Sequence, residues 1–165
     1  MGNVESMSPP LSGSARKVLD ALSRSGFIPE IMELPASTRT AQEAAQAVGC
    51  AVGQIAKSIV FRAERSGRAV LVVTSGANRV NEARLAETLG EPIGRADPEF
   101  VRARTGFGIG GVPPAGHAEP LTIFLDQDLM QHAEIWAAAG TPHAVFRLSP
   151  AQLLEITGGT VVSVK

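Results

Sequence analysis

A stretch rich in glycine and proline, between Thr105 and His117, is the first candidate for a binding site. It reads TGFGIGGVPPAGH, which suits neither a regular helix nor a regular strand and is too apolar for a flexible linker. Glycine lets a ligand approach main-chain amides closely, while Pro113 and Pro114 fix φ and lack an amide donor. The pattern predicts a rigid loop whose backbone forms the wall of a binding site.

Lys57 is the single side chain with the most specific expected role. If residues 57–61 form a strand, the two-residue period places Lys57 on the same face as Ile59 and Phe61, which are expected to point into the core. An ammonium buried without a partner is costly, so such a lysine is normally paired with a carboxylate or kept for an anionic ligand. Two interpretations stay open: a ligand contact at the rim of an apolar cavity, and a surface lysine that reaches solvent.

The three histidines do not predict a metal site. His117, His132 and His143 lack the spacing of metal ligands, and no cysteine pair accompanies them. His132 is expected on the surface of a helix and His143 in a loop. His117 ends the glycine-proline stretch, where its imidazole could donate or accept a hydrogen bond to a substrate.

Other motifs favour structural roles. The run from Gly106 to Gly111 fits the letters G-x-G-x-x-G, but it follows a predicted helix and precedes two prolines, so no dinucleotide site and no cofactor are expected. Ser75 lacks the flanking glycines of a nucleophile elbow and an obvious base, which favours a role in a turn. Asp126, between a strand and a helix, is expected to cap the helix or form a turn.

Composition and charge limit the class of protein. The 165 residues are 44% hydrophobic, 19% charged and 4% aromatic, which is typical of one globular domain with an aliphatic core. No apolar run approaches the ~20 residues of a membrane span, and no secretory signal is recognisable, so a cytoplasmic protein without a membrane partner is expected. The single cysteine, Cys50, is interpreted as a small structural hydrophobe, with a reactive thiol as the alternative.

A net charge of −1 provides no global attraction to nucleic acid, so DNA is not expected as a partner and any RNA contact should be local. One segment concentrates arginines that could face phosphates or could form a solvated surface together with nearby glutamates. These arginines are Arg79, Arg84, Arg95, Arg102 and Arg104.

The elements predicted from periodicity, caps and glycine stops alternate without regular βαβ spacing. Helices are predicted from residue 12 or 14 to 26, at 40–49, 52–56, 81–90, 97–104 and 128–140, and from 149 onward; strands at 28–34, 57–61, 69–74, 121–125, 144–148 and 160–164. The pattern favours an α/β (mixed α+β) fold, with a curled, barrel-like mixed sheet surrounded by helices. A flexible tail is expected at residues 1–11, followed by one domain at 12–165.

Three ordered motifs together resemble the YbaK/ProX family of aminoacyl-tRNA deacylases, from the predicted helix at Thr40 to the terminal strands. They are Gln54 to Phe61; Ser75 to Val80 with Leu85-Ala86 and Leu89-Gly90; and Thr105-Gly106 leading to Gly110-Gly-Val-Pro-Pro114. Family members often carry serine where this chain has Pro113 and aspartate where it has Asn81.

The resemblance implies a single-domain trans-editing enzyme, similar to the insertion domain of bacterial prolyl-tRNA synthetase, that hydrolyses the ester between a wrong amino acid and tRNA. It implies that Lys57 is functionally critical and that the loop from Gly110 to Pro114 shapes the amino-acid pocket. The expected partner is the acceptor end of an aminoacyl-tRNA, and the expected substrate is tRNA(Pro) that carries a small non-cognate amino acid. Prolyl-tRNA synthetase or an elongation factor are further candidate partners.

The expected site follows from the loop and the lysine together. Lys57 would anchor the 3′-terminal phosphate or ribose, an amide of Gly110 or Gly111 would stabilise the oxyanion, and water would attack, oriented by backbone, by His117 or by a hydroxyl of the terminal adenosine. The substrate-binding residues are expected to be Val112, Pro113, Pro114, Ser75, Gly76 and Thr105. Two alternatives remain: a non-catalytic module that binds aminoacylated RNA ends or a small metabolite, and an esterase for small free esters.

Overall fold

The computed structural model describes residues 11–35 and 40–165. Within them one mixed sheet of eight strands runs in the order β1-β7-β6-β2-β3-β5-β8, with β4 paired to β2 beside this path. The strands are β1 Ile31–Glu33, β2 Ile55–Ala63, β3 Ala69–Ser75, β4 Ile93–Arg95, β5 Thr122–Asp126, β6 Ile135–Ala138, β7 Ala144–Leu148 and β8 Thr160–Val162. The α-helices are α2 Gly13–Arg24, α3 Ala41–Val48, α4 Glu82–Leu89, α5 Pro98–Thr105 and α6 Pro150–Thr157, with short 3-10 helices η1 Val52–Gln54 and η2 Gln127–Gln131.

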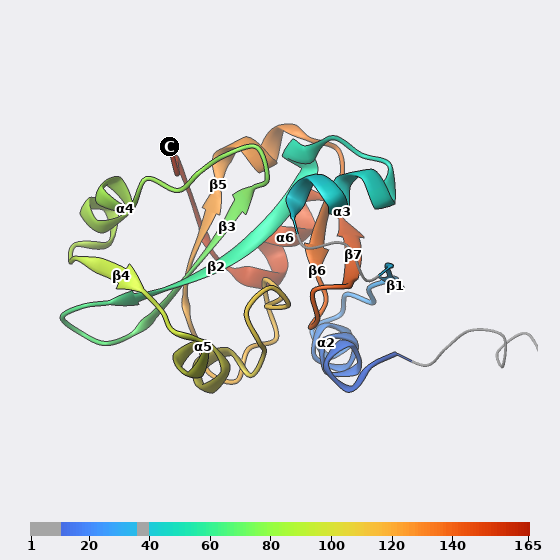
Figure 1. Cartoon of the computed structure of the whole chain (residues 1–165), viewed down its shortest axis with the longest axis horizontal. Coiled ribbons are helices and arrows are strands. Elements are labelled where there is room, and N and C mark those ends of the chain that lie inside the picture. The colour runs from blue at the N-terminus through green and yellow to red at the C-terminus, as the bar shows by residue number, and fades with distance from the viewer. Residues whose placement is uncertain (1–10, 36–39) are drawn as a thin grey trace, which may run out of the picture.

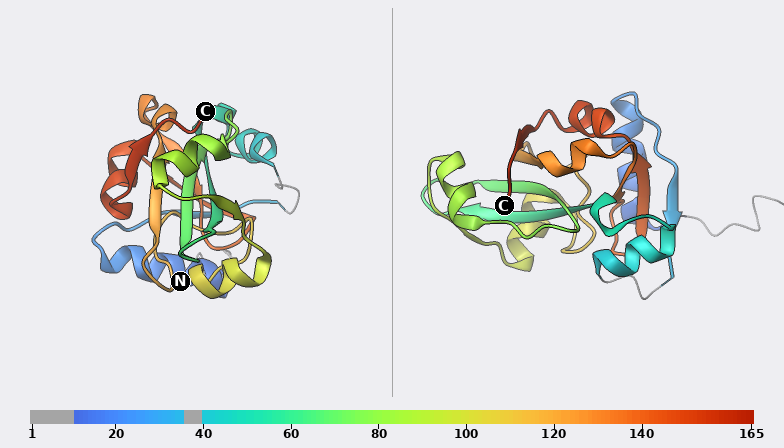
Figure 2. Two further views of the ribbon diagram at one scale, coloured as in Figure 1. Left: turned by 90° about the vertical axis from the view of Figure 1, so that its left-hand side faces the viewer. Right: turned by 90° about the horizontal axis from the view of Figure 1, so that it is seen from above.

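The predicted fold class, a mixed sheet surrounded by helices, is confirmed (Figure 1). Seen from above, the β2–β3 hairpin with α4 and β4 extends to one side, while β6, β7, β1 and α2 form the other side (Figure 2). The sheet curls between these two halves, and its end strands are β1 and β8. Of the tail expected at residues 1–11, residues 1–10 lie outside the described residues, and Leu11 packs against the core.

The β2–β3 hairpin is the centre of the sheet, as its sequence predicts. The two strands pair antiparallel from Ala56 opposite Ser75 to Arg62 opposite Ala69, and every residue of β3 is buried. An aliphatic strand of this kind is stable only when both faces are covered, because each exposed side would place apolar surface in water. The even residues of β2, such as Ala56 and Val60, join one apolar cluster, while Phe61 joins the other. The hairpin therefore separates two cores.

Local signals at the helix ends also match the structure. Thr40 and Glu43 form the predicted capping box, and Asn81 and Asp97 cap α4 and α5 through their side chains. Glycines in the left-handed conformation end these helices, among them Gly106, whose φ of 86° turns the chain from α5 into the glycine-proline loop.

The helix predicted at 128–140 is wrong. The segment forms η2, with His132 at its end rather than on a helix surface, and then strand β6. β6 pairs with β2 on one side and β7 on the other, and Ile135 and Ala137 point into the core. Pairing on both edges outweighs the helix preference of the alanine-rich run, whose pattern fits either period.

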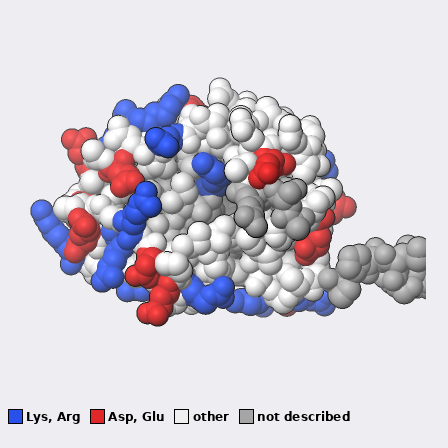
Figure 3. Space-filling model, viewed as in Figure 1, with Lys and Arg blue, Asp and Glu red and all other residues white. Residues whose placement is uncertain are grey.

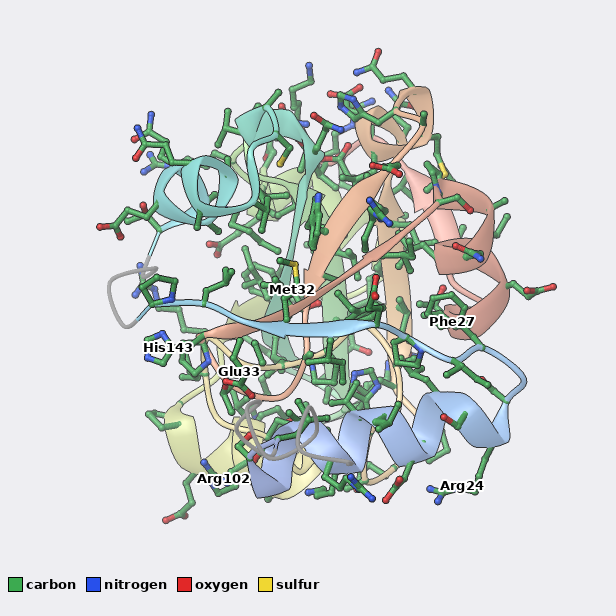
Figure 4. The ribbon with its side chains drawn as sticks, turned by 90° about the vertical axis from the view of Figure 1, so that its right-hand side faces the viewer. Arg24, Phe27, Met32, Glu33, Arg102 and His143 are labelled. Atoms are coloured by element: carbon green, nitrogen blue, oxygen red, sulfur yellow. The ribbon has the colours of Figure 1, made fainter. Side chains whose placement is uncertain are left out.

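Two further elements differ from the sequence prediction. β4 was not predicted, and the strand predicted at 28–34 is limited to the three residues of β1, which pair with β7. β1 lies at the edge of the sheet and passes above α2, with Met32 and Glu33 on this edge (Figure 4). β1 has a strand partner, β7, on one side only, so few of its residues are held in the sheet.

Candidate functional site

A cavity of about 530 Å³ lies where β2, β6, α3 and the glycine-proline loop meet. This volume falls within the range of small-molecule sites, roughly 300–1,000 Å³. Lys57 from β2 and Gly110 and Val112 from the loop line the same cavity. The residue that sequence analysis singled out and the loop that it singled out therefore share one cavity, although 53 positions separate Lys57 from Gly110 in the chain.

Lys57 lies half-buried on β2, opposite Thr74 of β3, and lines the cavity together with Ile59 and Phe61. Among the described residues, its ammonium makes no hydrogen bond and no ion pair. An ammonium next to aliphatic side chains loses solvation energy unless water or an anionic ligand contacts it. The position therefore offers a charge to whatever enters the cavity.

The loop keeps its shape through close backbone packing. A Cβ atom on Gly111 would lie 2.6 Å from Cα of Thr141 and 2.7 Å from the carbonyl oxygen of Gly140, so only glycine fits. The Gly140 amide donates to the Gly111 carbonyl at 2.9 Å, and the Gly111 amide donates to the Gly108 carbonyl at 3.0 Å. Gly110 has a φ of 90°, and its amide has no acceptor among the described residues.

Helix α2 supports the loop from outside. The Lys17 ammonium donates to the Gly106 carbonyl at 2.9 Å and lies 4.6 Å from the centre of the Phe107 ring. Phe107 itself is buried in the same core as Ala15 and Val18 of α2. These contacts fix the start of the loop against the helix.

Pro113, Pro114 and His117 lie behind the cavity wall, and none of them lines the cavity. Both prolines are buried, and Nε2 of His117 lies 2.7 Å from the Pro113 carbonyl oxygen. Because a carbonyl only accepts, Nε2 carries the proton in this contact. The imidazole therefore holds the loop from its far side.

Burial lowers the pKa of His117 below its ordinary value, while the hydrogen bond to Pro113 opposes the shift. Because the folded pKa is the lower one, the unfolded chain binds more protons as the pH falls. We expect the free energy of unfolding to decrease below about pH 6.5, the ordinary pKa of histidine. Denaturant titrations between about pH 5 and 7.5 test this. His117→Gln keeps a donor for Pro113 but does not titrate, and should show a shallower slope; equal slopes for both proteins would refute it.

Ser75, Gly76 and Thr105, predicted to bind substrate, are not among the residues that line the cavity. The Ser75 hydroxyl donates to the Gly53 carbonyl at 2.8 Å, and the Thr105 hydroxyl donates to the Val101 carbonyl at 2.7 Å. A Cβ on Gly76 would lie 2.6 Å from the Val52 carbonyl oxygen. All three residues make contacts with nearby backbone rather than with the cavity.

The turn after β3 is held by the buried carboxylate of Asp126. It accepts from the Ser75 amide at 2.9 Å, the Asn78 side chain at 2.8 Å and the Asp128 amide at 2.9 Å. Asp126 therefore serves the turn and caps η2, in line with its predicted role. The turn leads directly to Arg79, which lines the cavity.

A single phosphate-facing patch, one of the two interpretations of the five arginines, is not formed. Arg79 and Arg95 line the cavity, whereas Arg84 donates to the Lys165 carbonyl and Arg104 pairs with Glu119 at 3.1 Å. Lys and Arg are mixed with Asp and Glu over the half of the surface that contains α4, β4 and α5 (Figure 3). Around the cavity the balance is positive, because Glu82 is the one acidic side chain among the described residues that line it.

Several lining residues were not predicted from the sequence. Ala41 and Ala44 of α3 and Trp136 of β6 line the cavity, and the wrong helix at 128–140 concealed the place of Trp136. Ile109, at the loop tip, lines the cavity with 57% of its surface exposed. Its place between two glycines of a rigid loop is the sequence feature that could have identified Ile109 as a lining residue.

No group of three or more metal-type ligands is found within residues 11–35 and 40–165. Burial raises the pKa of the Cys50 thiol, which suits a small hydrophobe better than a reactive thiolate. In the same part of the chain, no helix has the length and apolarity needed to cross a membrane.

Comparison with known proteins gives a family match over residues 35–156, to the aminoacyl-tRNA editing domain. A solved structure, provisionally described as a trans-editing enzyme for prolyl tRNA synthetase, is 52% identical. Its TM-score is 0.91, and the alignment covers 94% of this chain and 99% of that one.

Three curated relatives are more distant. The uncharacterized protein YwhH of Bacillus subtilis is 30% identical, over 78% of this chain and 81% of its own length. The proline–tRNA ligase of Limosilactobacillus fermentum is 37% identical over 54% of this chain, but only 16% of the ligase is covered. EbsC of Enterococcus faecalis, provisionally named a Cys-tRNA(Pro)/Cys-tRNA(Cys) deacylase, is 26% identical over 73% of both chains.

Proposed function

Because the chain belongs to the aminoacyl-tRNA editing domain family and is a hydrolase of aminoacyl-tRNA esters, we propose that it removes a small non-cognate amino acid from tRNA(Pro). The reaction would take place in the cavity between β2 and the loop of Gly110 to Pro114. The observation that carries this proposal is the unpartnered ammonium of Lys57, which lines the same cavity as Gly110 and Val112.

Lys57 supplies the charge for the acceptor end. The terminal nucleotide of tRNA brings a phosphate and a ribose next to the ester. The Lys57 ammonium can bind this end without first breaking an ion pair or hydrogen bond to another protein group. Arg79 and Arg95 also line the cavity, so incoming phosphate meets a positive potential. A local contact of this kind agrees with a chain whose net charge is only −1.

The rest of the cavity selects the acyl group by size. Its walls include Val101, Val112 and Ala138, and among the described lining residues aliphatic side chains prevail. Apolar contacts alone discriminate between similar amino acids by only about 10–200-fold, so a second site that admits only small acyl groups adds the missing fidelity. The loop can set this limit because Gly111 packs closely on Thr141, so the loop cannot shift freely toward the cavity or away from it.

In the proposed reaction, one water molecule hydrolyses the ester. The water oxygen attacks the ester carbon, the carbonyl oxygen takes the negative charge, and the carbonyl re-forms as the ribose oxygen leaves. One proton of the water passes to that ribose oxygen, and the other leaves with the carboxyl group, which ionises. Of the two predicted oxyanion donors, the Gly110 amide has no acceptor among the described residues, whereas the Gly111 amide already donates to the Gly108 carbonyl. His117 acts on the loop from behind through Pro113.

A panel of mischarged tRNAs tests the proposal. Purified protein is incubated with tRNA(Pro) carrying alanine, cysteine, serine, threonine or proline, and the remaining ester is measured over time. We expect rapid loss of one or more small non-cognate amino acids, with prolyl-tRNA(Pro) retained. Protection of the ester without loss would indicate a non-catalytic binding module instead. Cleavage of small free esters at the same rate would indicate a general esterase.

The proposal also includes the protein that delivers the charged tRNA. Prolyl-tRNA synthetase or an elongation factor would release the acceptor end that the cavity takes up. Adding either protein to the panel assay measures whether it changes the rate of deacylation.

A further inference from the structure

Strand β2 has an open edge next to the cavity. On one side it pairs with β3 from Ala56 to Arg62. On the other side it pairs with β6 only at Ile55 and Ala56, and with β4 only from Phe61 to Ala63. Within the described part of the chain, residues 57–60 therefore have no strand neighbour on this second side.

The amides of Ser58 and Val60 face this open edge. The Ala63 amide donates to Arg68 on the hairpin side, and the next amide, of Glu64, donates to Pro92 on the β4 side. Successive residues of a strand direct their N–H groups to opposite sides, so even-numbered residues of β2 face β4, β6 and the gap between them. Both Ser58 and Val60 line the cavity, so the open edge of β2 lies next to it.

The Ser58 hydroxyl is a second, independent sign of a ligand. Its Oγ is fully buried and has no hydrogen-bond partner among the described residues. A buried hydroxyl without a partner costs about 1–3 kcal/mol, and most such groups in folded proteins are satisfied. Rotation about χ1 would bring this unpaired hydroxyl, on the same residue as an amide without a strand partner, to an acceptor that arrives with the substrate.

We propose that the open edge of β2 at Ser58 binds the carbonyl oxygen of the aminoacyl ester through the Ser58 N–H and hydroxyl. This inference rests on the proposed function. The Gly110 amide, from the loop that lines the same cavity, would be a further donor to the oxygen that becomes negative in hydrolysis. Two or more fixed donors at a developing oxyanion are the usual arrangement for acyl transfer.

The first test replaces the hydroxyl. Ser58→Ala removes a buried, unpaired group, so the free energy of unfolding should stay equal to that of the wild type or increase. The kcat/KM for the mischarged tRNA should nevertheless fall about 10–100-fold, mainly through kcat, because the lost bond is strongest in the transition state. Ser66→Ala, in the exposed turn of the hairpin, is the matched control and should keep wild-type kinetics.

The second test removes the amide. Semisynthesis can replace the N–H of residue 58 by an ester oxygen while keeping the serine side chain. The same replacement at Ile59 removes an N–H that faces β3 and serves as the control. We expect a loss of kcat of about 10²-fold at residue 58 and little loss at residue 59.

The outcomes separate the two proposals. If the wild type deacylates a mischarged tRNA and both changes at residue 58 leave kcat/KM unchanged, the Ser58 site is refuted and the proposed function stands. Equal losses at residues 58 and 59 would likewise refute it, because they would reflect the strand as a whole. If the wild type deacylates nothing in the panel, both proposals fail.

Discussion

Lys57→Ala is expected to lower kcat/KM for the mischarged tRNA by at least about 10³-fold while the protein stays folded. The Lys57 ammonium lines the cavity without a partner among the described residues, and loss of one charge-assisted contact made in the transition state costs about 3–4 kcal/mol, or 10²–10³-fold. Loss of phosphate binding adds to this effect. The measurement is single-turnover deacylation together with a denaturant titration.

Two variants make the result specific. Lys165→Ala removes another lysine, whose ammonium pairs with Asp128 at 3.1 Å away from the cavity, and should keep wild-type kinetics. Lys57→Arg keeps the charge but changes its shape, and should retain an intermediate rate. Wild-type turnover by Lys57→Ala would remove Lys57 from the mechanism.

Gly111→Ala should produce the largest loss of stability among changes in the loop. The new Cβ would meet three backbone atoms of Gly140 and Thr141 at 2.6 to 2.8 Å, and backbone cannot rotate away as a side chain can. We expect a loss of about 3 kcal/mol, which lowers Tm by about 6–12 °C for a chain of this size. Thermal and denaturant unfolding measure it.

The control for this change is Gly158→Ala. Gly158 ends α6 with a φ of 61°, and a Cβ there would meet no atom within 4 Å. It should cost only the backbone strain, about 1 kcal/mol. If Gly111→Ala is no less stable than Gly158→Ala, the close contact between the loop and residues 140–141 is not the source of its rigidity.

The elements that sequence predicted well are those set by local interactions. The capping box at Thr40 and the glycine at Gly90 act within one helical turn, so their residues alone indicate where α3 begins and α4 ends. The β2–β3 hairpin is equally local, since its strands are close in the chain and both aliphatic. Strand β6 could not be predicted in this way. Its pairing depends on β2, far away in the chain, and its alanines fit a helix as well as a strand.

The candidate site shows the same division. The two-residue period of the strand predicted which face Lys57 lies on, and the composition of the loop indicated Gly110 and Val112. These three residues could be proposed from the sequence, and they line the same cavity. The positions of Ser75 and Thr105 could not, because only the fold shows that their hydroxyls bond to nearby carbonyls. The open edge at Ser58 is also hidden in the sequence, because it arises where β6 and β4 leave β2.

A crystal structure with a non-hydrolysable aminoacyl-adenosine amide would show directly where the substrate binds. We expect the acyl group to lie in the cavity between β2 and the loop of Gly110 to Pro114, with the ribose at Lys57. An analogue bound at another surface, with this cavity unfilled, would contradict it.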